Sequence, residues 1–264
     1  MQVIIQPTAE KAARLAALLI ADQIGTNPFT VLGLATGRTM ERLYSQLVEL
    51  YSSGKIDFSK CRSFNLDEYV GLEPTDPHSY RSYMNRNLFD KINIDKESTH
   101  LPDGVAEDYA AEARHYEELI EQAGGIDLQL LGIGRSGHIG FNEPLSALRS
   151  RTREKGLTRT TIDQNSPLFD RPEDMPSRAF TMGIGTILDA RKILMVVTGS
   201  EKADILAKAV EGPVTSMISA TALQLHESTV VIADEDAARD LQAQDYYHWL
   251  YENEPEWRKY HDKV

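Results

Sequence analysis

A glycine-rich turn near the middle of the chain carries groups that can move protons. Residues 130–144 read LLGIGRSGHIGFNEP, with His138 followed five residues later by Glu143 and preceded by Ser136. Histidine exchanges protons near neutral pH, and a carboxylate bonded to its ring fixes the tautomer and stabilises the cation. This pattern predicts acid–base chemistry. The alternative is an ordinary turn around a buried, hydrogen-bonded histidine.

Two adjacent carboxylates, Asp67 and Glu68, follow an expected strand at 62–66. Neighbouring acids raise each other's pKa, which would suit a group that carries a proton between two atoms. The alternative is that one of them caps the start of a helix.

A third loop, Thr36-Gly37-Arg38-Thr39, lies between an expected strand at 29–35 and a helix. The start of a helix offers unpaired N–H groups to an anion, and the loop adds two hydroxyls and one positive charge. It lacks the glycine, lysine and serine spacing of a Walker A loop.

Apolar strands and amphipathic helices alternate along the chain. We expect strands at 3–5, 29–35, 62–66, 126–133, 192–198 and 229–233, with helices at 79–91, 104–123, 181–190 and 218–225 and after residues 8, 39 and 202. This alternation predicts an α/β fold with a doubly wound, mostly parallel, Rossmann-like sheet and helices on both faces. Strand ends then meet at one edge, so the loops at 36–39, 65–69 and 132–143 should converge there, which favours an enzyme.

No linker divides the 264 residues, so one domain is expected. Residues 145–178 contain three prolines and few apolar residues and predict an irregular segment that acts as a lid. The acidic, aromatic tail after residue 234 should pack on the domain or on a neighbouring subunit.

A net charge of −12 argues against nucleic-acid binding and against docking on anionic membranes. The single cysteine, Cys61, excludes an intrachain disulfide, and neither a signal peptide nor a membrane span is recognisable, so a cytoplasmic protein is expected. A local excess of positive charge, +4 over 149–159, is either an anion site or a solvated loop; its cations are Arg149, Arg151, Arg153, Lys155 and Arg159.

Residues 132–137 also satisfy the dinucleotide pattern G-x-G-x-x-G. That fingerprint opens a helix directly, whereas Gly140 and Pro144 follow here, and no acidic residue ends a second strand about 20 positions on. We therefore expect no nicotinamide cofactor.

Several stretches together resemble the glucosamine-6-phosphate deaminase family. They are LGLATGRTM (32–40), FNLDEYVGL (64–72) and LGIGRSGHIGFNEP (131–144), with weaker matches in MGIGTILDA (182–190) and GSEKA (199–203). The resemblance implies an enzyme of amino sugar catabolism that isomerises and deaminates glucosamine 6-phosphate to fructose 6-phosphate and ammonia. It implies neither metal nor organic cofactor.

By the same resemblance, Asp67 transfers a proton between C2 and C1 of the open-chain sugar, His138 assists ring opening, and Glu143 orients the histidine. The phosphate is expected on Thr36, Gly37, Arg38 and Thr39, with Lys202 as a counter-charge.

This chain departs from the family pattern at three positions. Ser136 stands where many members have an aspartate, so His138 is expected to rely on Glu143 alone for negative charge. Pro167 stands where many have a phosphate-binding arginine, and Arg38 replaces a glycine of the TGGT loop. We expect Arg38 to supply the guanidinium that position 167 lacks.

Ser146, Arg153 and Lys155 match positions that bind an activator in hexameric members, but the lid residues around them differ, so activation is not predicted. The assembly could be a monomer or a homo-oligomer. Alternative functions are a galactosamine-6-phosphate deaminase, a 6-phosphogluconolactonase, or a non-catalytic sugar-phosphate sensor; a sensor would have no need of Asp67, His138 and Glu143 together.

Overall fold

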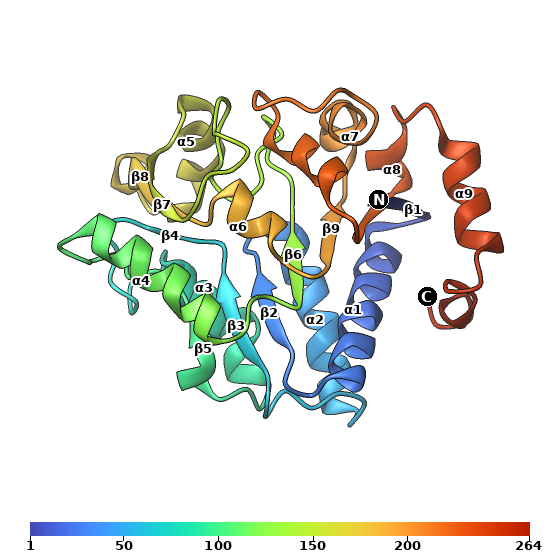
Figure 1. The fold of residues 1–264 in the computed structure, drawn as a ribbon, viewed down its shortest axis with the longest axis horizontal. Helices are drawn as coiled ribbons and strands as arrows, with labels where there is room; N and C mark the ends of the chain where they lie inside the picture. Colours follow the sequence, from blue (N-terminus) through green and yellow to red (C-terminus); the bar gives the residue numbers. More distant parts are fainter.

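The computed structural model covers residues 1–264 and is built on a seven-stranded parallel sheet (Figure 1). The strand order is β1-β10-β9-β6-β2-β3-β5. The strands are β1 (Gln2–Gln6), β2 (Val31–Leu34), β3 (Arg62–Asn65), β5 (Thr99–His100), β6 (Leu128–Leu131), β9 (Ile193–Val197) and β10 (Thr229–Asp234). The central strands are buried and mostly apolar because helices cover both faces of the sheet; Gln129 of β6 is a buried polar exception.

Helices connect most of the strands, and right-handed crossovers place α1 and α2 on one face and α4 on the other. The helices around this sheet are α1 (Ala9–Thr26), α2 (Arg38–Ser52), α3 (Tyr80–Asn87), α4 (Tyr109–Gln122), α6 (Ile184–Leu188), α7 (Ala203–Val210), α8 (Glu235–Ala238) and α9 (Gln244–Asn253). Side-chain caps define several helix starts: Thr8 accepts from the amide of Lys11, and Asp108 caps α4. The cap at Asp108 makes α4 begin five residues later than expected.

A second, three-stranded antiparallel sheet, of order β4-β8-β7, lies beside the carboxyl ends of the main strands. Its strands are β4 (Asp67–Tyr69), β8 (Arg178–Thr181) and β7 (Arg153–Gly156), and helix α5 (Arg159–Asn165) lies between β7 and β8 in the chain. The segment at 145–178 therefore contains a strand and a helix in addition to irregular chain. Its strands are short and show no clear apolar alternation, so their pairing defines them: β8 pairs with β4 on one side and with β7 on the other.

One hydrophobic core of 60 buried residues fills the space between the main sheet and its helices. Trp257 and Tyr260 of the tail are part of this core, which confirms that the tail packs on the domain. Tyr246 and Trp249 of α9 remain exposed. None of the helices combines the length and the apolar character that a membrane crossing requires.

Candidate active site

The sheet order brings the expected functional loops together. Strands β9, β6, β2 and β3 are consecutive neighbours, and the loops that follow them begin at Thr198, Gly132, Ala35 and Leu66. In a parallel sheet these loops all leave the same edge. The structure thus places the loops at 36–39, 65–69, 132–143 and 199–202 around one region.

Asp67 lies where the chain leaves the main sheet and joins the second one. It pairs with Thr181 of β8, is only 6% exposed, and its carboxylate makes no hydrogen bond within the chain. Burial, and secondarily the charge of Glu68, raise the pKa of Asp67 to about 8. A buried carboxyl with no protein partner is free to exchange a proton with a ligand.

The histidine loop approaches Asp67 through Gly140. This glycine has φ +55°, and a Cβ on it would lie 3.5 Å from Oδ2 of Asp67 and 2.8 Å from Oγ1 of Thr181. The positive φ and the clash that a Cβ would make with Thr181 require glycine at position 140, and the backbone there lies in contact distance of the Asp67 carboxylate. Asp67 and His138 therefore border the same site.

Glu68 has a different role from its neighbour. Its Oε1 accepts from the amides of Tyr69 at 2.8 Å and Tyr80 at 2.9 Å, and its Oε2 accepts from the amide of Arg81 at 2.9 Å. The bonds from Tyr80 and Arg81 hold the start of α3. Of the two adjacent acids, Glu68 supports a helix and Asp67 is left free.

Asp67→Asn should stabilise the fold at alkaline pH. Folded Asp67 keeps its proton up to about pH 8, whereas an unfolded aspartate loses it near pH 4. The stability that comes from the protonated form is thus complete below pH 4 and is lost as the pH rises through 8. The asparagine side chain of the variant cannot ionise. The free energy of unfolding of the variant should therefore exceed that of the natural chain by a margin that grows between pH 5 and 9 to on the order of a few kcal/mol. Urea unfolding at pH 5, 7 and 9 measures this, and a constant difference would contradict it.

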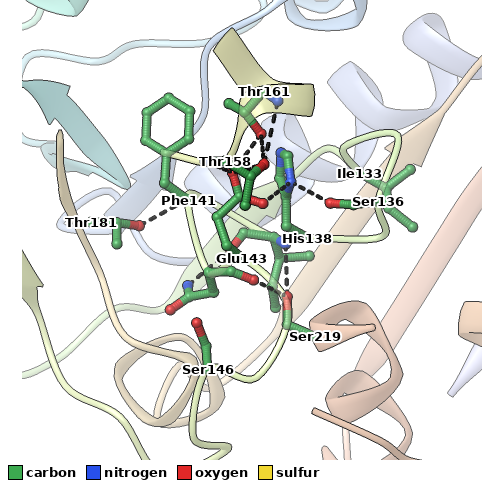
Figure 2. Close-up of polar contacts among 12 residues, drawn as sticks. Ile133, Ser136, His138, Phe141, Glu143, Ser146, Thr158, Thr161, Thr181 and Ser219 are labelled. Atoms are coloured by element: carbon green, nitrogen blue, oxygen red, sulfur yellow. Dashed lines mark hydrogen bonds and ion pairs between the residues drawn. The ribbon is translucent and has the colours of Figure 1, made fainter. Parts of the chain in front are cut away.

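His138 has two polar neighbours at the same ring nitrogen (Figure 2). Nδ1 lies 2.8 Å from Oγ of Ser136 and 3.3 Å from Oε2 of Glu143. Both the histidine and the glutamate side chains are largely shielded from solvent. His138 thus has two neighbours at Nδ1, of which Glu143 alone carries a charge.

Glu143 is held by residues that sequence reasoning did not identify. Its Oε1 accepts from the amide of Thr158 at 3.2 Å, from the hydroxyl of Thr158 at 3.0 Å and from the hydroxyl of Thr161. Burial acts to raise the pKa of Glu143, but the nearby His138 imidazole, with the hydrogen bonds from Thr161 and Thr158, outweighs it and lowers that pKa to about 2. Glu143 is therefore a carboxylate at neutral pH. No local signal pointed to threonines 15 and 18 residues away.

An aromatic wall, which the sequence also did not indicate, closes one side of the site. It consists of Tyr69, Tyr80 and Phe141. The rings of Tyr80 and Phe141 stack at 12° with centroids 6.1 Å apart, and the hydroxyl of Tyr80 lies 3.2 Å from that of Tyr69. Buried rings exclude water, which strengthens electrostatic interactions near Asp67.

The loop at 36–39 has the geometry of an anion site. Gly37, at φ +117°, precedes α2, and no side chain caps that helix. The amides of Arg38 and Thr39 have no acceptor within the chain, and the exposed Arg38 guanidinium has no carboxylate partner. Lys202 donates to the carbonyl of Ile133 at 2.9 Å, and burial lowers its pKa. Free amides and nearby cations match the needs of a phosphate.

The basic stretch at 149–159 does not form one anion site. Arg151 pairs with Glu117 and Asp189, and Arg159 pairs with Asp163. Arg153 donates to Oδ1 of Asn142 and to Oγ of Ser146. These positive charges serve contacts within the chain.

No group of three or more histidine, cysteine or acidic side chains has the arrangement of a metal site. The loop at 132–137 does not open a helix, because the next helix begins at Arg159. A dinucleotide fingerprint requires that helix, so these glycines serve the loop itself.

The structure is an α/β protein with a Rossmann-like sheet. One edge of that sheet carries a free aspartate, a histidine–glutamate pair and an uncapped helix start. These groups are suited to acid–base chemistry on a small anion. The chain belongs to the family of glucosamine-6-phosphate isomerases and 6-phosphogluconolactonases, whose sequence model matches residues 5–232.

Among its relatives, the glucosamine-6-phosphate deaminase of Hahella chejuensis is 51% identical over 250 residues, which is 95% of each chain. That of Cellvibrio japonicus is 51% identical over 247 residues, or 94% of each chain. A solved monomeric glucosamine-6-phosphate deaminase is 42% identical and covers 91% of this chain and 100% of its own, with a TM-score of 0.89. The 6-phosphogluconolactonase of Trypanosoma cruzi shares the fold, at 20% identity and a TM-score of 0.72 over 91% of this chain and 97% of its own.

Proposed function

We propose that this chain converts glucosamine 6-phosphate and water into fructose 6-phosphate and ammonia. The observation that carries the proposal is the free, buried carboxyl of Asp67 beside the His138–Glu143 pair. The deaminase relatives, about half identical over nearly their whole length, support the same substrate.

The phosphate of the substrate would bind the amides of Arg38 and Thr39, with the Arg38 guanidinium and Lys202 supplying positive charge. Fixing this remote group orients the sugar toward the acid–base residues. His138 would open the pyranose ring by moving the hydroxyl proton of C1 to the ring oxygen. Glu143, as a carboxylate, would stabilise the imidazolium formed on the way.

Asp67 would then act on the open chain. Its carboxylate takes the proton from C2 and returns it to C1, while a proton from the nitrogen passes to the C1 oxygen. The C1 aldehyde thereby becomes an alcohol, and an imine remains at C2. Water adds to that imine, ammonia leaves, and the C2 carbonyl of fructose 6-phosphate forms. In the empty site the raised pKa keeps Asp67 mostly protonated at neutral pH, but the amino sugar's ammonium group would favour the carboxylate.

Ammonia release from glucosamine 6-phosphate, galactosamine 6-phosphate and unphosphorylated glucosamine tests this function. We expect turnover of the first and none of the last. Turnover of galactosamine 6-phosphate alone would show that this sugar, and not glucosamine 6-phosphate, is the substrate. Hydrolysis of 6-phosphogluconolactone without ammonia release would favour the lactonase alternative, and tight binding of the phosphosugar with no turnover at all would favour a sensor.

Arg38→Ala should raise the KM for the sugar phosphate about tenfold, because an exposed guanidinium–phosphate contact is worth roughly 1.4 kcal/mol. Pro167 lies in the 3-10 helix Ser166–Leu168 and has no cation to offer. Initial-rate kinetics measure the change. Arg42→Ala is the matched control, because Arg42 lies on the same helix and pairs with Glu10. An unchanged KM in Arg38→Ala would remove Arg38 from the phosphate site.

A cytoplasmic location belongs to the same proposal, since the single cysteine, Cys61, is buried and unpaired, as is usual in reducing compartments. Light scattering during size-exclusion chromatography decides between a monomer of 29.6 kDa and a homo-oligomer.

A further inference from the structure

Every hydrogen bond that the carboxylate of Glu143 accepts comes from the segment that begins α5. Oε1 accepts from the amide and the hydroxyl of Thr158 and from the hydroxyl of Thr161. Oε2 has no hydrogen-bond partner of its own and lies 3.3 Å from Nδ1 of His138. One oxygen of the carboxylate is thus anchored, and the other faces the histidine (Figure 2).

This anchoring acts together with His138 in keeping Glu143 charged. The side chain is almost fully buried, and a buried carboxylate without donors takes up a proton. A neutral glutamic acid would no longer stabilise an imidazolium beside it. Donors on Oε1 therefore help to keep a negative charge available on Oε2, where it faces His138.

Thr161 is suited to this role by its place in the fold. It is 2% exposed, whereas the neighbouring Thr160 on the same helix is exposed. Asn165, one turn further on, donates to the hydroxyl of Tyr69 at 3.1 Å. Residues four apart share one helix face, so α5 contacts Glu143 at one end and the aromatic wall beside Asp67 at the other.

We propose that Thr161 is a positioning residue: its hydroxyl anchors Oε1 of Glu143 so that Oε2 faces Nδ1 of His138. The inference rests on the proposed function for its kinetic consequence but not for its geometry. The segment that covers the site thereby completes the histidine–glutamate pair, so a displaced α5 would leave Glu143 without its donors.

Thr161→Val, Thr161→Ser and Thr160→Val form the test. Valine keeps the shape of threonine without the hydroxyl, and serine keeps the hydroxyl. We expect Thr161→Val to lower kcat about tenfold, the effect of one hydrogen bond to a charged group, with KM changed less than twofold. Thr161→Ser should retain more than half of kcat, and Thr160→Val should match the natural chain.

A readout that does not depend on turnover is the ¹⁵N NMR spectrum of His138. Its ring-nitrogen shifts should change in Thr161→Val and stay unchanged in Thr160→Val. If Thr161→Val does not fold, Thr161→Ala serves in its place, with thermal unfolding as the check. An unchanged His138 spectrum, or equal losses of kcat in the valine and serine variants, would overturn the proposal. Absence of ammonia release in the natural chain would overturn the proposed function, while the spectra would still test the position of Thr161.

Discussion

Asp67→Asn should lower kcat for ammonia release about 10³-fold, within the range that a positioned acid–base group contributes. The amide keeps the shape of the carboxyl but cannot take a proton from C2. The adjacent Glu68 cannot replace it, because its carboxylate is bound to the backbone amides of Tyr69, Tyr80 and Arg81. KM should change little, since the phosphate contacts lie on another loop.

Proton exchange gives a second measurement for Asp67. In D₂O the natural chain should exchange the C2 proton of bound sugar with solvent, and Asp67→Asn should not. Asp236→Asn, on the exposed side of the short helix α8, is the control for an unrelated loss of charge. A variant that kept a tenth of the natural rate would exclude Asp67 as the base.

His138→Gln is expected to lower kcat about 10²-fold, because ring opening then depends on water as the proton carrier. Glutamine is polar and close in size, so the loop should keep its shape. That loop is held independently by Ser219, whose hydroxyl accepts from the amide of Ile139 and donates to the carbonyl of Asn142. His115→Gln, an exposed histidine of α4, is the matched control.

A double variant that combines His138→Gln with Glu143→Gln tests whether His138 and Glu143 act as a unit. Oε2 of Glu143 lies 3.3 Å from Nδ1 of His138, so we expect Glu143 to act on the substrate through the histidine. The loss in the double variant should therefore exceed that of His138→Gln by less than about threefold, because the effects of coupled residues do not add. If the two losses multiplied, Glu143 would have a separate role.

Local pattern was sufficient for most of the main sheet. The expected strands at 3–5, 62–66, 192–198 and 229–233 correspond closely to β1, β3, β9 and β10. Three of these strands, at 3–5, 192–198 and 229–233, are apolar runs, which a sheet covered by helices on both faces buries, so tertiary context did not change them. The two-residue β5 and the strands of the second sheet carry no such run, and they were missed.

It was also predictable from the sequence that the functional loops lie close together. The role of each acidic residue in them was not. Parallel strands send their following loops to one edge, so spacing along the chain was enough to bring Asp67, His138 and the loop at 36–39 into one region. Spacing could not tell which of two adjacent acids is free. Contacts with α3 decided that, and they left Asp67 free.

By itself, the sequence determined the class of fold, the edge at which the chemistry lies and the residue types present there, because hydrophobic periodicity and turn chemistry act over a few residues. Only the tertiary structure decided the charge and direction of Glu143, the aromatic wall beside Asp67 and the ion pairs of Arg151 and Arg159 in the basic stretch. Those properties depend on burial and on partners far along the chain, such as Thr161 for Glu143.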